Sequence, residues 1–169
     1  MVEMDSDLSH NPADLVRLLA GLVDQDVVIG SRYVSGGSIP RWGVHRRLLS
    51  RAGNTYSSLM LGLPVRDMTS GFRVYRAEVL RSIDLHHVRA NGYGFQIEMT
   101  YRAARAGARI AEIPIQFVDR EAGESKMSAS TIVEAIFLVT RWGVTRGASR
   151  LMGAVAAPRR RTGHDADLG

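Results

Sequence analysis

Asp26-Val27-Val28-Ile29-Gly30 forms a short apolar run between polar neighbours, which predicts a buried β-strand. Ahead of it, leucines recur at helical spacing, which predicts an amphipathic helix that starts near Pro12 and ends near Val23. Residues 2–4, ahead of that helix, are predicted to be the last residues of another strand. Strand, helix and strand in this order make a βαβ unit, so we expect an α/β protein with a mostly parallel sheet flanked by helices.

Beyond residue 30 the pattern continues to alternate between helix and strand. Residues 44–61 are expected to form a helix that ends before Gly62, with arginines on one face near its start. Another helix is expected over residues 95–106. Alternation over residues 109–118 predicts a strand, which Pro114 places at an edge of the sheet. The apolar positions of the 44–61 helix are Leu48, Leu49, Ala52, Tyr56, Leu59 and Met60.

The composition, 45% apolar and 23% charged over 169 residues, is that of an ordinary globular domain with a hydrophobic core. There is no cysteine, which excludes disulfides and thiolate metal sites. The formal charge is +5, which suits a phosphate-bearing partner such as nucleic acid, an anionic membrane surface or a phosphorylated substrate. Aromatic residues make up only 7% of the chain and lie mostly at core-like positions, which disfavours a nucleic-acid-binding module.

The carboxyl-terminal part differs in character from the rest. Residues 131–144 are apolar on most sides but are too few to span a bilayer. A buried helix and an amphipathic helix lying in a membrane interface both fit them. We therefore divide the chain into an α/β domain over 1–127, an apolar or interfacial helix over 128–147, and a basic, disordered tail over 148–169.

Asp5 and Asp7 lie where the first predicted strand ends. Carboxylates two residues apart point to the same side of an extended backbone, so this pair is a candidate site for one divalent cation. Mg²⁺ is commonly held by one or two carboxylates, with water and phosphates completing its coordination. The pair thus favours transfer from a diphosphate-linked donor, although a solvated turn or helix cap explains the same residues.

Several motifs follow one another along the chain. They are Asp-x-Asp-Leu-Ser-His-x-Pro at 5–12, Gly-Ser-Arg-Tyr-Val at 30–34 followed by a Gly-Gly loop, the arginine-rich helix start near 46, Asp-x-Thr-Ser-Gly-Phe-Arg at 67–73, Gly-Tyr-x-Phe-Gln at 92–96 and Arg-x-x-Gly-x-Ser-Lys at 120–126.

As a set, these motifs resemble the family-2 glycosyltransferases that make polyprenyl- or dolichyl-phosphate mannose, and the resemblance covers residues 2–147. It implies a GT-A fold, a Rossmann-like α/β arrangement. It also implies transfer of mannose from GDP-mannose to a polyprenyl phosphate, with inversion. The enzyme would lie peripherally on the cytoplasmic face of a membrane, and a membrane-protein partner is compatible with that location.

The resemblance also assigns roles to residues of the metal and donor site. Asp5 and Asp7 would bind Mg²⁺ or Mn²⁺ together with the donor diphosphate. Ser9 stands where many members carry a glutamine that touches the metal, so contact through water is expected. Arg120 falls on a position that meets the donor phosphates, and Lys126 belongs to the same loop.

On the acceptor side, Arg32, Arg46 and Ser50 fall on the positions that hold the lipid phosphate. A phosphate monoester is already anionic near neutral pH, so it needs positioning and charge relief rather than a general base. Arginine forks match phosphate oxygens in geometry. The catalytic residues implied are therefore Asp5, Asp7, Arg32 and Arg120.

Family members normally have a further segment ahead of the Asp-x-Asp motif, which reads the guanine and ribose. We therefore expect an incomplete GT-A fold without its amino-terminal half, and we expect that this chain alone neither binds GDP-mannose tightly nor turns it over. Because the segment that reads the donor in family members is expected to be missing, UDP-glucose is an alternative donor. The alternatives from other classes are an inactive remnant, a non-catalytic membrane-surface adaptor and a basic nucleic-acid-binding module.

Overall fold

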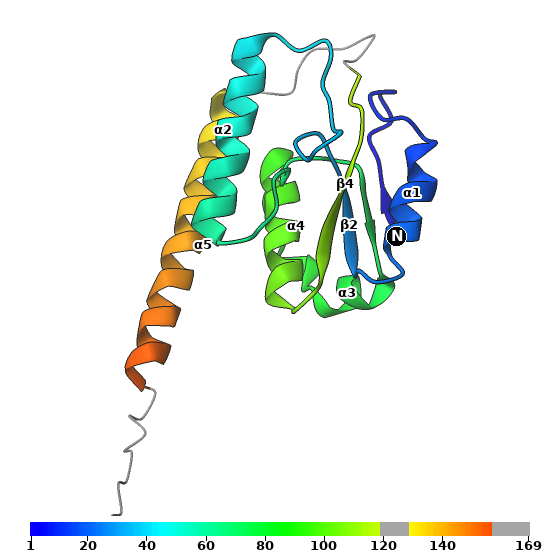
Figure 1. Cartoon of the computed structure of the whole chain (residues 1–169). Coiled ribbons are helices and arrows are strands. Elements are labelled where there is room, and N and C mark those ends of the chain that lie inside the picture. The colour runs from blue at the N-terminus through cyan, green and yellow to red at the C-terminus, as the bar shows by residue number, and fades with distance from the viewer. Residues whose placement is uncertain (119–128, 157–169) are drawn as a thin grey trace, which may run out of the picture.

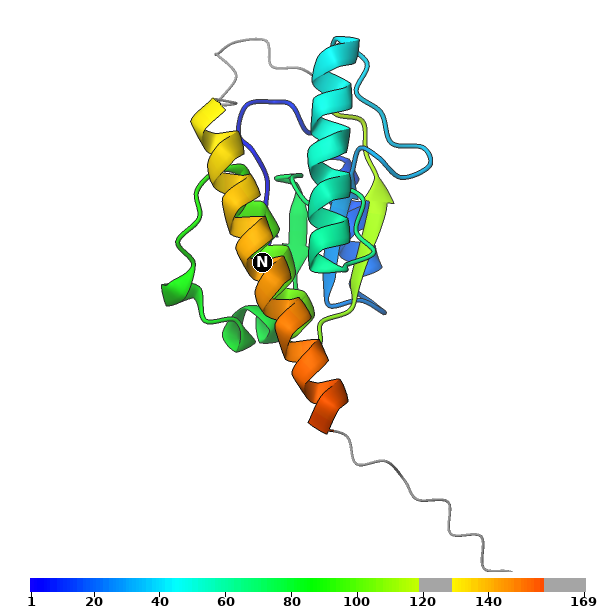
Figure 2. The same cartoon turned by 90° about the vertical axis from the view of Figure 1, so that its left-hand side faces the viewer.

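The computed structural model describes residues 1–118 and 129–156 (Figure 1). A sheet forms the middle layer, with α1 (Asp14–Gly21) on one face and α4 (Tyr93–Arg105) on the other. Outside α4, helices α2 (Val44–Leu61) and α5 (Ala129–Ala156) lie side by side (Figure 2). The remaining elements are β1 (Val2–Glu3), β2 (Val27–Ser31), β3 (Arg73–Tyr75), α3 (Ala77–Ser82), the 3₁₀ helix η1 (Leu85–His87) and β4 (Ile110–Pro114).

The α/β class is confirmed, but the sheet is mixed rather than mostly parallel. Its strand order is β1-β3-β2-β4. Strand β3 pairs antiparallel with both β1 and β2, whereas β2 and β4 pair in parallel. Strands β1, β2 and β4 therefore share one direction, and the predicted βαβ unit exists with β3 inserted between its two strands. Strand β4 lies at an edge, as Pro114 predicted.

Strand β2 is buried along its whole length because helices cover both faces of the sheet. On one face, Val28 belongs to the same packed cluster as Leu18 of α1. On the other face, Val27 and Ile29 belong to a cluster that includes Ile97 of α4. Alternate residues of a strand point to opposite faces, which explains why the run is apolar without interruption.

Helix α2 has the bounds that the sequence predicts, and it ends at Gly62 in the left-handed conformation (φ 57°). Only part of its apolar side faces the core, contrary to the usual amphipathic pattern: Leu61 is buried, and Tyr56 and Met60 pack against the core. Leu48 is 62% exposed and Leu59 is 75% exposed, while Asn54 and Ser57 are buried. The inner face also carries polar side chains because Asn54 binds the loop ahead of β3: its Oδ1 accepts from the backbone N–H of Met68 at 2.8 Å.

Helix α5 packs against both α2 and α4 and continues to Ala156, beyond the end at residue 147 that the sequence predicted. Val139 is buried, but Val133 and Phe137 are 65% and 66% exposed. The helix is thus neither fully buried nor fully exposed. Within the described residues, no helix combines the length and the apolar character needed to cross a membrane.

Candidate active site

A cavity of about 180 Å³ lies where the chain leaves the carboxyl ends of β1 and β2, and we call it the site cavity. Open α/β sheets commonly bind ligands at this edge. Three of the sequence-predicted residues line it together: Asp5 after β1, Arg32 after β2 and Arg46 from the first turns of α2. The family resemblance assigned Asp5 to the donor side and Arg32 and Arg46 to the acceptor side of one active site.

Asp5 is held at the wall of the site cavity by Gly71 and His10. A Cβ atom on Gly71 would lie 2.9 Å from Asp5 Oδ2, so only glycine allows this approach without a shift. His10 Nε2 lies 3.4 Å from the same oxygen. The imidazole is buried between the rings of Phe72 and Phe117, at centroid distances of 5.2 and 5.3 Å. This packing fixes the carboxylate while half of it stays exposed.

The extended geometry expected for the Asp5–Asp7 pair is wrong. The chain bends at residues 6–8, and Leu8 has a positive φ of 61°. Asp7 Oδ1 accepts from the backbone N–H of Ser9 at 3.1 Å and from the Ser9 hydroxyl at 2.5 Å. Ser9 is buried, so it orients Asp7 in an Asx-type turn. A shared cation on Asp5, Asp7 and Ser9 stays a prediction.

The carboxylate oxygens of Asp5 and Asp7 suit a hard divalent cation whose remaining ligands are water or phosphate oxygens. Within the described residues, no group of three or more His, Cys, Asp or Glu side chains is placed to hold a metal ion. Mg²⁺ and Mn²⁺ accept carboxylate oxygens together with phosphate and water oxygens, so two carboxylates suffice when a diphosphate is present. The half-exposed carboxylate of Asp5 is compatible with that role.

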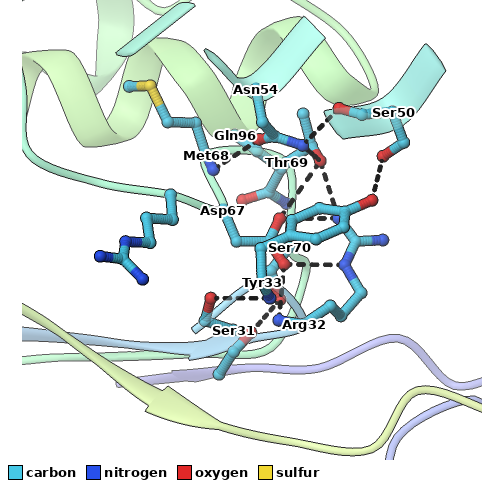
Figure 3. A network of polar contacts seen from close by, with 12 residues as sticks. Ser31, Arg32, Tyr33, Ser50, Asn54, Asp67, Met68, Thr69, Ser70 and Gln96 are labelled. Carbon is cyan, nitrogen blue, oxygen red and sulfur yellow. Dashed lines mark hydrogen bonds and ion pairs between the residues drawn. The ribbon is translucent and has the colours of Figure 1, made fainter. Parts of the chain in front are cut away.

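Arg32 is buried and held by Asp67, a partner that the sequence analysis did not assign (Figure 3). Its Nε donates to Asp67 Oδ2 at 2.8 Å and its Nη2 donates to Asp67 Oδ1 at 2.7 Å. Nη2 also donates to the Thr69 hydroxyl at 2.8 Å. Burial works against both charges, but the mutual attraction outweighs it: the pKa of Arg32 is raised and the pKa of Asp67 is lowered.

Aromatic rings complete the surroundings of the arginines. Arg32 Cζ lies 5.4 Å from the ring centroid of Phe117 and 5.7 Å from that of Trp42. Arg46 Cζ lies only 4.0 Å from the ring centroid of Trp42. Each contact is within cation–π range, so Trp42 brings the two guanidinium groups to one side of the site cavity.

The loop that carries Asp67 is fixed to the sheet at both ends. The backbone N–H groups of Arg66 and Asp67 each donate to the Glu112 carboxylate of β4 at 2.8 Å. The Ser70 hydroxyl donates to the Gly30 carbonyl of β2 at 2.6 Å. The fully buried Arg73 donates to the carbonyl oxygens of the same loop. The motif at 67–73 is therefore a rigid support for Arg32.

Ser50 lies beside the site cavity rather than in it. Its hydroxyl accepts from the Tyr33 hydroxyl at 2.7 Å, and it lines a neighbouring cavity of about 290 Å³ between α2 and α5. That cavity is mainly apolar and shares Trp42, Thr69 and Tyr93 with the site cavity. Arg120 and Lys126 lie outside the described residues.

Comparison with known proteins finds a matching family and similar curated relatives. Residues 1–84 match the family model of Glycosyl transferase family 2. The chain is 53% identical over 144 residues to the undecaprenyl-phosphate mannosyltransferase of Micrococcus luteus, a match that covers 85% of the chain and 59% of the relative. It is 48% identical over 156 residues to the polyprenol monophosphomannose synthase of Mycolicibacterium smegmatis, covering 92% of the chain and 59% of the relative. The chain thus spans about three-fifths of the length of these curated relatives.

Proposed function

The chain belongs to glycosyltransferase family 2, and from that premise we propose that it transfers mannose from GDP-mannose to a polyprenyl phosphate. The observation that carries the proposal is the meeting of Asp5, Arg32 and Arg46 in one cavity, in a chain that is 53% and 48% identical to two mannosyltransferases of lipid phosphates. A donor diphosphate and an acceptor phosphate repel each other, and charges of opposite sign are needed where they meet.

In this proposal, Arg32 and Arg46 receive the acceptor phosphate. Arg32 is already oriented by Asp67, so little conformational entropy is lost when an anion binds to it. The isoprenoid chain continues into the apolar cavity between α2 and α5, which shares walls with the site cavity. Ser50 and Tyr33 lie at the junction of the phosphate and the hydrocarbon.

Asp5 and Asp7 would hold Mg²⁺ or Mn²⁺, which neutralises the departing diphosphate of the donor when it is bound. The phosphate acceptor is anionic near neutral pH and attacks without a general base. The protein's own contribution is therefore to orient the acceptor with Arg32 and Arg46 and to place the Asp5 carboxylate with His10 and Gly71. Inversion at the sugar carbon follows from one in-line displacement.

We also place the protein peripherally on the cytoplasmic face of a membrane. The support is a surface of exposed apolar side chains on the neighbouring helices α2 and α5. Such a surface on helices rich in arginine is typical of proteins that lie in the membrane interface. The members of this surface are Val44, Leu48, Leu49 and Leu59 of α2 and Val133, Ile136, Phe137 and Val144 of α5.

The test is a transfer assay with the full chain and vesicles that contain undecaprenyl phosphate. Radiolabelled GDP-mannose and UDP-glucose are supplied in parallel, each with Mn²⁺ or with a chelator. Because Asp5, Arg32 and Arg46 meet in one cavity of this chain, we expect label in the lipid fraction from GDP-mannose in the presence of metal, contrary to the inactivity expected from the sequence. If label appeared from UDP-glucose and not from GDP-mannose, the donor would be UDP-glucose. If Arg46→Gln bound undecaprenyl phosphate as tightly as the wild type does, Arg46 would not hold the acceptor phosphate and the proposed site would be overturned.

A further inference from the structure

A third cavity, of about 570 Å³, shares only Arg32 with the site cavity. Its walls are the loop at residues 33–40 and three arginines, Arg47 and Arg51 from α2 and Arg66 from the loop that follows it. We call it the arginine cavity. Its lining residues include no aspartate or glutamate.

The guanidinium groups of the three outer arginines have no carboxylate partner among the residues that the structure describes. Arg47 Nη2 donates to the carbonyl oxygens of Ile39 and Trp42, at 3.4 and 3.1 Å, which holds its guanidinium against the loop. Arg51 Cζ lies 6.0 Å from the ring centroid of Tyr33. Gathered cations raise the local concentration of anions, so this cavity is suited to an anionic group.

A row of exposed apolar side chains runs along α2 next to the arginine row. Val44, Leu48 and Leu59 are 70%, 62% and 75% exposed. Side chains four positions apart are neighbours on a helix, so Arg47 and Arg51 form one row and Val44 and Leu48 form the adjacent row. A ligand that satisfies both rows carries an anionic group and hydrocarbon together, which is the chemistry of a phospholipid.

We propose that the arginine cavity binds the phosphate of an anionic phospholipid headgroup while the adjacent apolar row of α2 enters the acyl region. Guanidinium forks match the oxygens of a phosphodiester. This site shares Arg32 with the acceptor site but is otherwise distinct from it, because Arg46 and Asp5 line the site cavity and not the arginine cavity. The inference rests on the membrane placement proposed above, but not on sugar transfer.

The experiment measures binding of the full chain to phosphatidylcholine vesicles with and without phosphatidylglycerol, and without polyprenyl phosphate. The test variant is Arg51→Gln/Arg66→Gln. The matched control is Arg81→Gln/Arg89→Gln, which removes two exposed arginines elsewhere and lowers the formal charge equally, from +5 to +3. Circular dichroism melting shows whether each variant is folded, and none of the four residues is assigned to the acceptor or metal site.

We expect phosphatidylglycerol to strengthen binding of the wild type and of the control. The test variant should bind about 30-fold more weakly, since each basic residue near an anionic surface contributes about fivefold. Equal binding by the wild type and the test variant, or equal weakening of both variants, would overturn the proposal. The proposal would also be overturned if millimolar inorganic phosphate released the protein from the vesicles, because the cavity would then be a site for free phosphate. If the wild type bound the phospholipid headgroup but transferred no sugar, the result would count against the proposed function and not against this site.

Discussion

Replacing Asp67 with asparagine keeps the size of the side chain but removes the charge that faces Arg32. The Asp67 side chain is fully buried and accepts three hydrogen bonds from Arg32: the backbone N–H at 2.9 Å, Nε at 2.8 Å and Nη2 at 2.7 Å. An amide offers one oxygen in place of two, and its NH₂ group would face a donor. The Arg32 guanidinium would stay buried without a counter-charge.

The expected cost follows from that burial. Removing one partner of a buried ion pair typically costs about 3–5 kcal/mol, because an uncompensated charge is left behind. A domain of this size has a total free energy of unfolding of about 5–15 kcal/mol, so the loss is a large share of it. With a urea dependence of about 2 kcal/mol per molar, the unfolding midpoint of Asp67→Asn should fall by about 2 M.

The assay is urea unfolding of the full chain, followed by circular dichroism, for Asp67→Asn, Arg32→Met and the double variant. The double variant removes both charges, so it should recover part of the stability that Asp67→Asn loses. A fall in the free energy of unfolding of less than about 1 kcal/mol for Asp67→Asn would refute the buried pair. Simple additivity of the two single substitutions would refute the coupling.

The other predictions concern the site and the response to pH. Arg46→Gln should raise the KM for polyprenyl phosphate about 10- to 100-fold, because a charge-assisted hydrogen bond is lost, and steady-state kinetics with vesicle-borne acceptor measure it. Gly71→Ala places a methyl group 2.9 Å from Asp5 Oδ2, so the Mn²⁺ concentration needed for half-maximal transfer should rise roughly tenfold. If that concentration were unchanged, Asp5 would not be a metal ligand. The hydrogen bond from Arg109 lowers the pKa of Asp26 from 3.8 to about 2. A carboxyl group whose pKa is lower in the folded state stabilises the fold at pH values above its unfolded-state pKa. This stabilisation is lost as the pH falls through the folded-state pKa. Asp26→Asn should therefore reduce the free energy of unfolding above about pH 4, and the difference from wild type should vanish as the pH falls to about 2, as urea titrations across this range would show.

The parts of the fold that the sequence predicted are those set by local pattern. The run at 26–30 formed β2 and the periodic segment at 44–61 formed α2, because apolar spacing and a terminal glycine act within a few residues. Asp5 and Arg32 meet because strands that run in one direction end at the same edge of the sheet.

The parts of the fold and of the site that the sequence did not predict depend on contacts between residues far apart in the chain. Nothing local indicates that β3 inserts between β1 and β2, since strand order is fixed by packing of the whole sheet. Asp67 lies 35 residues from its partner Arg32, so no local pattern connects the two side chains. The outward apolar face of α2 was also missed, because the inner face is occupied by polar contacts such as those of Asn54.

The central claim is that a cation held by Asp5 and the acceptor phosphate held by Arg46 occupy one cavity. The most direct test is phosphorus NMR of a short-chain polyprenyl phosphate with the full chain, GDP and Mn²⁺, because a paramagnetic ion broadens only nearby nuclei. We predict strong broadening with the wild type and its loss in both Asp5→Asn and Arg46→Gln. Binding of the acceptor without broadening, or broadening that persists in both variants, would contradict the claim.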